Sequence, residues 1–250
     1  MNIKIIKAPD SEKSFAIIDK PYGLPSAPLS EDDHNNAFYQ AACLFPDLLN
    51  VNGKKIIEHG LIHRLDTATS GLMIIAASQE CYDLLQEEQK KGKITKTYKA
   101  RCNVVPCSLD GFPAAPVDKN KLEKGSCFEI SSYFRPYGMG HKEVRPVTKA
   151  SGKAALQKLG KPVIYTTSIK ILELDKENSL AEVECKITNG YRHQVRCHLA
   201  WCGLAVENDK LYNPALKNES AEPMKFCATG LCFEYPRGDL NSYDRKDTWT

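Results

Sequence analysis

Two apolar segments meet at an arginine and an aspartate in the stretch "LIHRLDTATSGLMIIAAS", residues 61–78. A plain hairpin would need only the turn residues of this stretch, so the charged pair Arg64 and Asp66 is surplus to folding. On extended backbone, positions i and i+2 point to the same side, which would place the guanidinium beside the carboxylate. A neighbouring cation opposes the tendency of a buried carboxylate to take up a proton. The spacing therefore predicts an ionised carboxylate that acts as a nucleophile or base, with a purely structural ion pair as the alternative.

A second group of candidate residues lies in "YRHQVRCHLA", residues 191–200. Apolar residues at i, i+4 and i+7 predict a helix that ends at Gly203. Arg192 and Arg196 are four residues apart, so we expect them to share one face near the start of this helix. A helix start favours anions, so the pair suits a phosphate or a carboxylate such as Asp66.

A run of basic residues with an aromatic ring among them occupies residues 90–101, "KKGKITKTYKAR". Six lysine and arginine residues surround Tyr98, a composition typical of a nucleic-acid-binding segment. A solvated charged face is the alternative interpretation.

Other chemistries find little support in the sequence. Neither form of glycine-rich phosphate loop occurs, and no Gly-x-Ser-x-Gly elbow is present. Ten cysteines are scattered without any Cys-x-x-Cys pair, and pairs such as Cys102/Cys107 have four residues between them. We interpret the thiols as small hydrophobic groups. A zinc protein is the weaker alternative.

The elements that would position these residues can be predicted from periodicity and turn signals. Strands are expected at residues 15–18 and 95–105, and two long antiparallel strands within residues 163–188. Helices are expected at residues 37–49, ended near Pro46, and after Ser78 as N-cap, ended by Gly92. Residues 106–146 should form loops and short strands inserted in the domain. Runs of strands separated from helices predict an α+β fold.

The bulk composition agrees with one domain over residues 1–250. The chain is 42% hydrophobic and 26% charged with a net charge of +3, which suits a globular protein with a sizeable core. No apolar run approaches the length of a membrane span, and the N-terminal residues lack a signal peptide. We therefore expect a cytoplasmic protein.

The stretch "HRLDTATSG" resembles the H-R-L-D-x-x-T-S-G signature of the RluA-like family of RNA pseudouridine synthases. Further segments resemble that family in the same order. They are "IIDKPYGLPSAP", "KTYKA", "NGYRHQVRCHLAWCGLAVENDKLY" and "FCATGLCFEYP". The similarity runs from Ile17 to Pro236 and is poorest at residues 106–146.

The resemblance implies a fold, a reaction and a set of site residues. The implied fold is a mixed, largely antiparallel sheet with flanking helices and a central catalytic cleft. The implied reaction breaks the N1–C1′ bond of uridine and rejoins the base through C5, without cofactor or metal. Asp66 would be the catalytic residue, and it would either attack C1′ or assist loss of the C2′ proton. The implied substrate-binding residues are Arg64, Tyr98, Arg196, Lys20 and Gln194.

More specific roles also follow from the resemblance. Arg64 would help to extrude the uridine, Tyr98 would pack on its base, and Arg196 would pair with Asp66. The expected partner is ribosomal or transfer RNA, for a monomer without an obligatory protein partner. Too few residues precede the first strand for an N-terminal S4 domain. A non-catalytic RNA-binding or RNA-folding protein is the alternative.

The sequence also departs from the family pattern. Tyr191 stands in an arginine position, Asn208-Asp209 replaces Gly-Asp, and Phe226-Cys227-Ala228 replaces Leu-His-Ala. We expect these changes to alter RNA contacts.

Overall fold

The computed structural model describes residues 2–106, 109–216, 222–246 and 248. The chain divides into two compact units, Met1–Thr97 with Cys227–Thr250 and Tyr98–Phe226. That both units belong to one catalytic domain stays a prediction. Cys107 lies outside the described residues.

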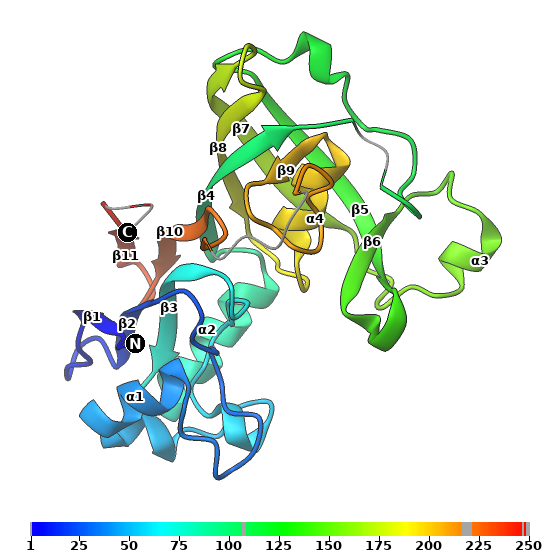
Figure 1. Ribbon diagram of the computed structural model, residues 1–250. Coiled ribbons are helices and arrows are strands. Elements are labelled where there is room, and N and C mark those ends of the chain that lie inside the picture. Colours follow the sequence, from blue (N-terminus) through cyan, green and yellow to red (C-terminus); the bar gives the residue numbers. More distant parts are fainter. Residues whose placement is uncertain (1, 107–108, 217–221, 247, 249–250) are drawn as a thin grey trace. The chain divides into compact units, whose positions relative to one another are not determined.

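The first unit is built on a mixed sheet whose strands run in the order β1-β2-β3-β10, with β11 paired to β10 (Figure 1). These strands are β1 (Lys4–Lys7), β2 (Phe15–Lys20), β3 (Ser70–Ala76), β10 (Phe226–Glu234) and β11 (Leu240–Asp244). Among the described residues, β1 with β2, β2 with β3 and β10 with β11 pair in antiparallel fashion, and β3 with β10 is parallel. The helical segments are α1 (Ala37–Leu44), η1 (Pro46–Asn50), η2 (Ile56–Glu58) and α2 (Gln79–Lys90).

Local sequence explains the elements of this unit. The Ser78 side chain accepts a hydrogen bond from the Cys81 amide at 3.2 Å, which caps α2 as predicted. The apolar face of α2 buries Leu85 in the same core as Ile74 of β3. The predicted strand at residues 15–18 is confirmed as part of β2, and the predicted helix from Ala37 stops at Leu44, two residues before Pro46.

Gly71 allows β10 to lie directly beside the start of β3. Its φ is +121°, and a Cβ at this position would lie 2.1 Å from the Ala228 carbonyl oxygen. A larger residue would therefore push β10 away from the loop that carries Asp66. This explains why glycine follows the small polar cluster of the motif.

The second unit contains a largely antiparallel sheet in the order β4-β8-β7-β5-β6, with β9 paired to β4. These strands are β4 (Thr95–Val104), β5 (Cys127–Tyr137), β6 (Glu143–Val147), β7 (Tyr165–Asp175), β8 (Leu180–Ile187) and β9 (Leu204–Val206). The helical segments are η3 (Lys119–Lys121), η4 (Met139–His141), α3 (Lys153–Leu156) and α4 (Gln194–Trp201). The unit begins within β4, at Tyr98, and ends at Phe226, the first residue of β10.

The long strands β7 and β8 confirm the predicted antiparallel pair, but β5 differs from the prediction. Residues 106–146 were expected to hold only loops and short strands, whereas β5 has 11 residues and pairs with β7. Its inward face carries Ile130, Ser132 and Phe134. Ser132 interrupts the apolar alternation, because its hydroxyl is buried against the His198 ring at 2.9 Å.

Helix α4 packs on one face of this sheet (Figure 1), where the His198 ring lies 2.9 Å from the Thr167 hydroxyl of β7. It begins at Gln194 because His193 has a left-handed backbone, with φ of 56°. Arg192 therefore precedes the helix, and the prediction that it shares a helix face with Arg196 is wrong. The helix itself is confirmed.

The α+β class and the mixed, mostly antiparallel arrangement of strands agree with the prediction. Within the described ranges, no helix combines the length and apolar composition needed to cross a bilayer.

Cysteine thiols contribute to the cores of both units. All nine described cysteines are free, and six of them are buried. Burial raises the pKa of a thiol because the thiolate loses its hydration. It raises the pKa of Cys81 to about 12. The pKa values of four more buried thiols are raised for the same reason: Cys102, Cys185, Cys197 and Cys227.

These thiols predict a loss of stability at alkaline pH. In the unfolded chain a thiol loses its proton near pH 9, whereas the folded chain keeps the proton to higher pH. The folded state then binds more protons, so the free energy of unfolding should fall above pH 9 by up to about 1.4 kcal/mol per pH unit for each thiol. Lys20 and Lys96, whose pKa values burial lowers to about 8, act in the opposite direction but are fewer.

Urea unfolding between pH 8 and 11 would measure this slope. Cys185→Val should make it shallower by about 1.4 kcal/mol per pH unit, and Cys43→Ala, at an exposed position, should leave it unchanged. Equal slopes for Cys185→Val and the parent would contradict the assignment.

Candidate active site

Asp66 lies in a loop that residues 20–26 hold from two sides. The Ser26 hydroxyl donates to the Leu65 carbonyl at 2.6 Å and accepts from the Leu65 amide at 3.0 Å. The Gly23 amide donates to the Thr67 carbonyl at 2.9 Å. A turn closes when the Thr69 amide donates to the Asp66 carbonyl at 2.9 Å. The backbone on both sides of Asp66 is thus fixed, while the residue itself stays partly exposed.

Lys20 supplies a buried positive charge behind this loop. Its side chain has no exposed surface, and the ammonium group donates to the carbonyl oxygens of Leu24 at 2.7 Å, Pro21 at 3.0 Å and Thr67 at 3.3 Å. Burial lowers the pKa of Lys20 to about 8, and the Asp66 carboxylate opposes this shift by favouring the ammonium ion. These contacts engage the ammonium group with the backbone of the loop, and direct binding of substrate by Lys20 stays a prediction. It acts on Asp66 through its charge.

Arg64 does not form the predicted ion pair with Asp66. Among the described residues its carboxylate partner is Glu58, whose Oε1 lies 2.9 Å from Nη1 of Arg64. Residues 63–66 are not a regular strand, so the i, i+2 argument does not hold here. The Arg64 side chain is 55% exposed. An exposed ion pair contributes about 0–1 kcal/mol, so separating Arg64 from Glu58 would cost little.

Tyr98 is a buried ring on β4, in the second unit. It is 7% exposed and stacks on Phe226, with ring centroids 5.2 Å apart and ring planes 8° apart. The sequence singled out Tyr98 but not its support. From the sequence, Phe226 was noted only as a departure from the family pattern.

Arg196 is held by a buried carboxylate that the sequence did not assign to it. Its Nε and Nη2 donate to the two Asp209 oxygens at 2.8 and 2.7 Å. Asp209 also accepts from the amides of Leu211 and Tyr212 at 2.9 and 3.3 Å. Both side chains are at most 5% exposed, so this two-pronged pair fixes the guanidinium. The pairing of Arg196 with Asp66 stays a prediction.

Gln194 uses its side chain within the second unit. Its amide nitrogen donates to the Thr166 carbonyl at 2.9 Å and the Thr167 hydroxyl at 3.1 Å, and its oxygen accepts from the Tyr191 amide at 3.0 Å. The side chain is 2% exposed. These contacts hold the turn before α4 to β7, and direct substrate binding by Gln194 stays a prediction.

The basic run at residues 90–101 is largely neutralised. Lys91 and Lys93 pair with Glu88 at 3.3 and 3.1 Å, and Arg101 pairs with Glu207. Lys96 is 4% exposed, and burial lowers its pKa to about 8. Few of the six charges thus remain for phosphates, which weakens the prediction of an RNA-binding segment here.

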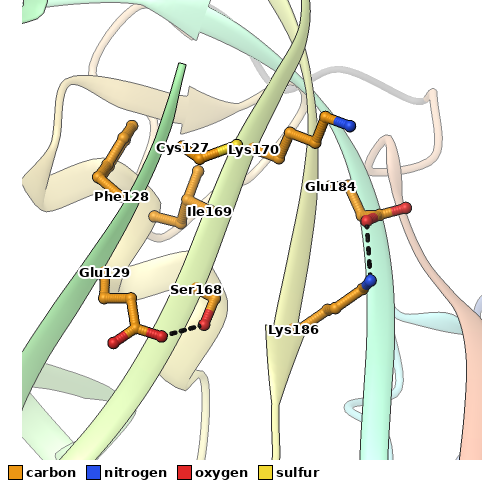
Figure 2. Close-up of a pocket in the computed structure, with 8 residues that line it drawn as sticks. All are labelled: Cys127, Phe128, Glu129, Ser168, Ile169, Lys170, Glu184 and Lys186. Carbon is orange, nitrogen blue, oxygen red and sulfur yellow. Dashed lines mark hydrogen bonds and ion pairs between the residues drawn. The ribbon is translucent and has the colours of Figure 1, made fainter. Parts of the chain in front are cut away.

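A shallow groove of about 350 Å³ lies on the other face of β5, β7 and β8 (Figure 2). Its polar groups bind each other: Ser168 donates to Glu129 at 2.7 Å, and Lys186 lies 3.4 Å from Glu184. None of the six predicted site residues lines it. In the described part of the chain, no group of three or more His, Cys, Asp or Glu side chains is arranged to hold a metal ion.

Comparison with known families gives a match over most of the chain. A family model described as RNA pseudouridylate synthase matches residues 14–201. Among curated relatives, an uncharacterized RNA pseudouridine synthase of Bacillus subtilis, YlyB, is 24% identical over 226 residues, covering 90% of this chain and 63% of the relative. A tRNA pseudouridine(31) synthase of Saccharomyces cerevisiae is 29% identical over 206 residues, covering 80% of this chain and 45% of the relative. The chain thus spans less than two thirds of the length of these relatives.

The solved structure of human RNA pseudouridylate synthase domain containing 1 matches with a TM-score of 0.66 at 18% identity. The match covers 98% of this chain and 84% of the human chain. At this identity the likeness establishes the fold.

Proposed function

Because this chain belongs to the RNA pseudouridylate synthase family, we propose that it isomerises specific uridines of RNA to pseudouridine, with Asp66 as the catalytic residue. The observation that carries the proposal is the loop of Asp66. Lys20 and Ser26 donate hydrogen bonds to the main chain of this loop, which lies within the segment that the family model matches. The buried positive charge of Lys20 also acts on the Asp66 carboxylate.

The proposed reaction breaks the N1–C1′ bond and forms a C5–C1′ bond. N1 gains a proton and C5 loses one, so no net oxidation or external group is required. The carboxylate can serve by attacking C1′ or by assisting loss of the C2′ proton, and both uses need its negative charge. Replacing the hydrogen at C2′ by deuterium distinguishes these two routes, because it slows the reaction only if the C2′ proton is lost.

The other residues receive roles that fit their contacts. Arg64, exposed and weakly paired, would hold the RNA backbone as the uridine is extruded. Tyr98, backed by Phe226, would pack on the base, and Arg196, fixed by Asp209, would pair with Asp66. Lys20 and Gln194 would position the site.

The proposal is tested by incubating the purified chain with transfer RNA and ribosomal RNA transcripts, digesting the RNA and quantifying pseudouridine. We expect product with chelator present and no added cofactor. RNA binding without product in either class would favour the RNA-binding alternative, and dependence on stoichiometric zinc would revive the metal alternative.

The substrate is RNA of either class, and the name of the yeast relative supports transfer RNA. The proposal further includes action in the cytoplasm by a monomer without an obligatory protein partner.

Substitution of Tyr98 tests its role on the base. Tyr98→Phe keeps the ring and its stack on Phe226, so we expect turnover and RNA affinity close to those of the parent. Tyr98→Ala should lose the stacking contribution, about 1–3 kcal/mol for one base, and turn over more slowly. Both variants are compared by single-turnover kinetics and RNA titration. Equal behaviour of the Ala and Phe variants would show that the ring is not the stacking platform.

A further inference from the structure

Unpaired positive charge in the second unit gathers on residues 138–164, hereafter the basic segment. It contains η4, β6, α3 and the connections that lead to β7. Its single carboxylate, Glu143, pairs with Arg145 at 2.6 Å. Five exposed lysines remain: Lys142, Lys149, Lys153, Lys158 and Lys161. Within the described residues, none of the five forms an ion pair with a carboxylate.

The contrast with the other basic stretches is one of pairing. Several lysines elsewhere on the surface lie beside carboxylates, as Lys55 does with Glu58 and Lys124 with Glu173. The run at residues 90–101, which the sequence had favoured, is also largely paired or buried. Lysines without a carboxylate partner can exchange counterions for phosphates.

The basic segment is also anchored, so its charges have defined positions. Arg145 is 6% exposed, lies 4.4 Å from the ring centre of Tyr137 and 4.8 Å from that of Phe112, and donates to the Asp110 carbonyl at 2.8 Å. These contacts brace the hairpin of β5 and β6. Further along, the Gly160 amide donates to the Phe134 carbonyl at 2.9 Å.

Two residues tie the segment to the start of α4, the helix that bears Arg196. The exposed Arg192 donates to the carbonyl oxygens of His141 and Glu143, the latter at 3.1 Å. Tyr191 stacks on Phe134 with centroids 5.1 Å apart, and its hydroxyl packs so closely on Gly160 that a Cβ there would meet it at 2.0 Å. Tyr191 therefore packs between Phe134 and the Gly160 end of the basic segment.

We propose that the basic segment is a docking surface for the phosphate backbone of the RNA substrate, outside the nucleotide that reacts. This rests on the proposed function for the identity of the polyanion. Charge complementarity favours RNA, because the surface offers cations without the alternating carboxylates of a protein-binding surface. Exposed lysines bind phosphates without reading the sequence, so the segment should add affinity and leave the choice of uridine to the site.

The test uses the full chain with four lysines replaced, Lys149→Gln, Lys153→Gln, Lys158→Gln and Lys161→Gln. Affinity for bulk transfer RNA is measured by fluorescence anisotropy over a range of potassium chloride concentrations. We expect the Kd to rise at least about tenfold at 0.1 M salt and the log–log salt slope to become shallower by about 3. Single-turnover rates at saturating RNA should stay within about twofold of the parent, because chemistry is untouched.

Two controls make the result specific to this surface. Replacing Lys55, Lys121, Lys124 and Lys186 by Gln changes the net charge equally but removes only lysines that already have carboxylate partners, so binding should change little. Replacing the four lysines of the basic segment by Arg keeps the charge and should keep the affinity. Circular dichroism of each variant checks folding.

Equal weakening by the two Gln sets would overturn the inference, since net charge alone would explain it. Unchanged binding by the first set, with the parent active, would overturn it and leave the proposed function standing. Loss of RNA affinity by the first set alone, with a parent that makes no pseudouridine, would support the surface and remove the proposed function.

Discussion

Asp66→Asn should abolish pseudouridine formation while leaving the chain folded and able to bind RNA. The amide keeps the shape of the side chain but has no negative charge to attack C1′ or to accept a proton. We expect the single-turnover rate to fall at least about a thousandfold, which corresponds to about 4 kcal/mol of barrier. The loop should persist, because the contacts of Ser26 and Lys20 are to its main chain.

A matched control for this substitution is Asp118→Asn, at a half-exposed carboxylate beside Lys121. It removes the same charge and should leave turnover unchanged. A purely structural role for Asp66 predicts the reverse pattern, with lower stability and retained activity. Residual turnover by Asp66→Asn within about tenfold of the parent, equivalent to about 1.4 kcal/mol, would reject its catalytic assignment.

Asp209→Asn should be the most destabilising of the substitutions considered. The change removes the negative charge that holds the Arg196 guanidinium, 5% exposed, and turns an amide nitrogen or a weaker acceptor toward it. Breaking a buried ion pair costs about 3–5 kcal/mol. We expect a loss of this size in the free energy of unfolding, measured by urea denaturation. Turnover at permissive temperature should also fall, because Arg196 is no longer held in place.

Glu207→Gln provides the comparison within the same unit. Its partner, Arg101, has a side chain that is 40% exposed, so loss of this pair should cost only about 0–1 kcal/mol. The double variant Arg196→Met with Asp209→Leu should cost less than the sum of the single changes, since no buried charge is left alone. An Asp209→Asn effect no larger than that of Glu207→Gln would contradict the view that Asp209 fixes Arg196.

Local sequence predicted the elements well where the signal was local. The serine cap of α2, the long pair of β7 and β8, and the helix after Gly190 follow from caps, alternation and helical spacing. The prediction failed at β5 because Ser132 occupies an inward position. A polar residue there is explained only by the His198 ring, which approaches from α4, more than 60 residues later.

The spacing of residues along the chain did not predict which charged side chains pair. Arg64 and Asp66 are neighbours in the chain, but the loop geometry directs Arg64 to Glu58. Arg192 and Arg196 were expected to act together, but the left-handed backbone of His193 separates an exposed residue from a buried one. Asp209 and the burial of Lys20 depend on tertiary contacts that no local pattern encodes.

Catalysis by Asp66 is tested most directly by following the hydrogen at C5 of uridine. Formation of the C5–C1′ bond must expel that hydrogen, so RNA labelled with tritium at C5 should release it to water. We predict one tritium released per pseudouridine formed by the parent chain, and none above background by Asp66→Asn at equal RNA occupancy. Release by Asp66→Asn at a rate near that of the parent, or RNA binding by the parent without any release, would contradict the account.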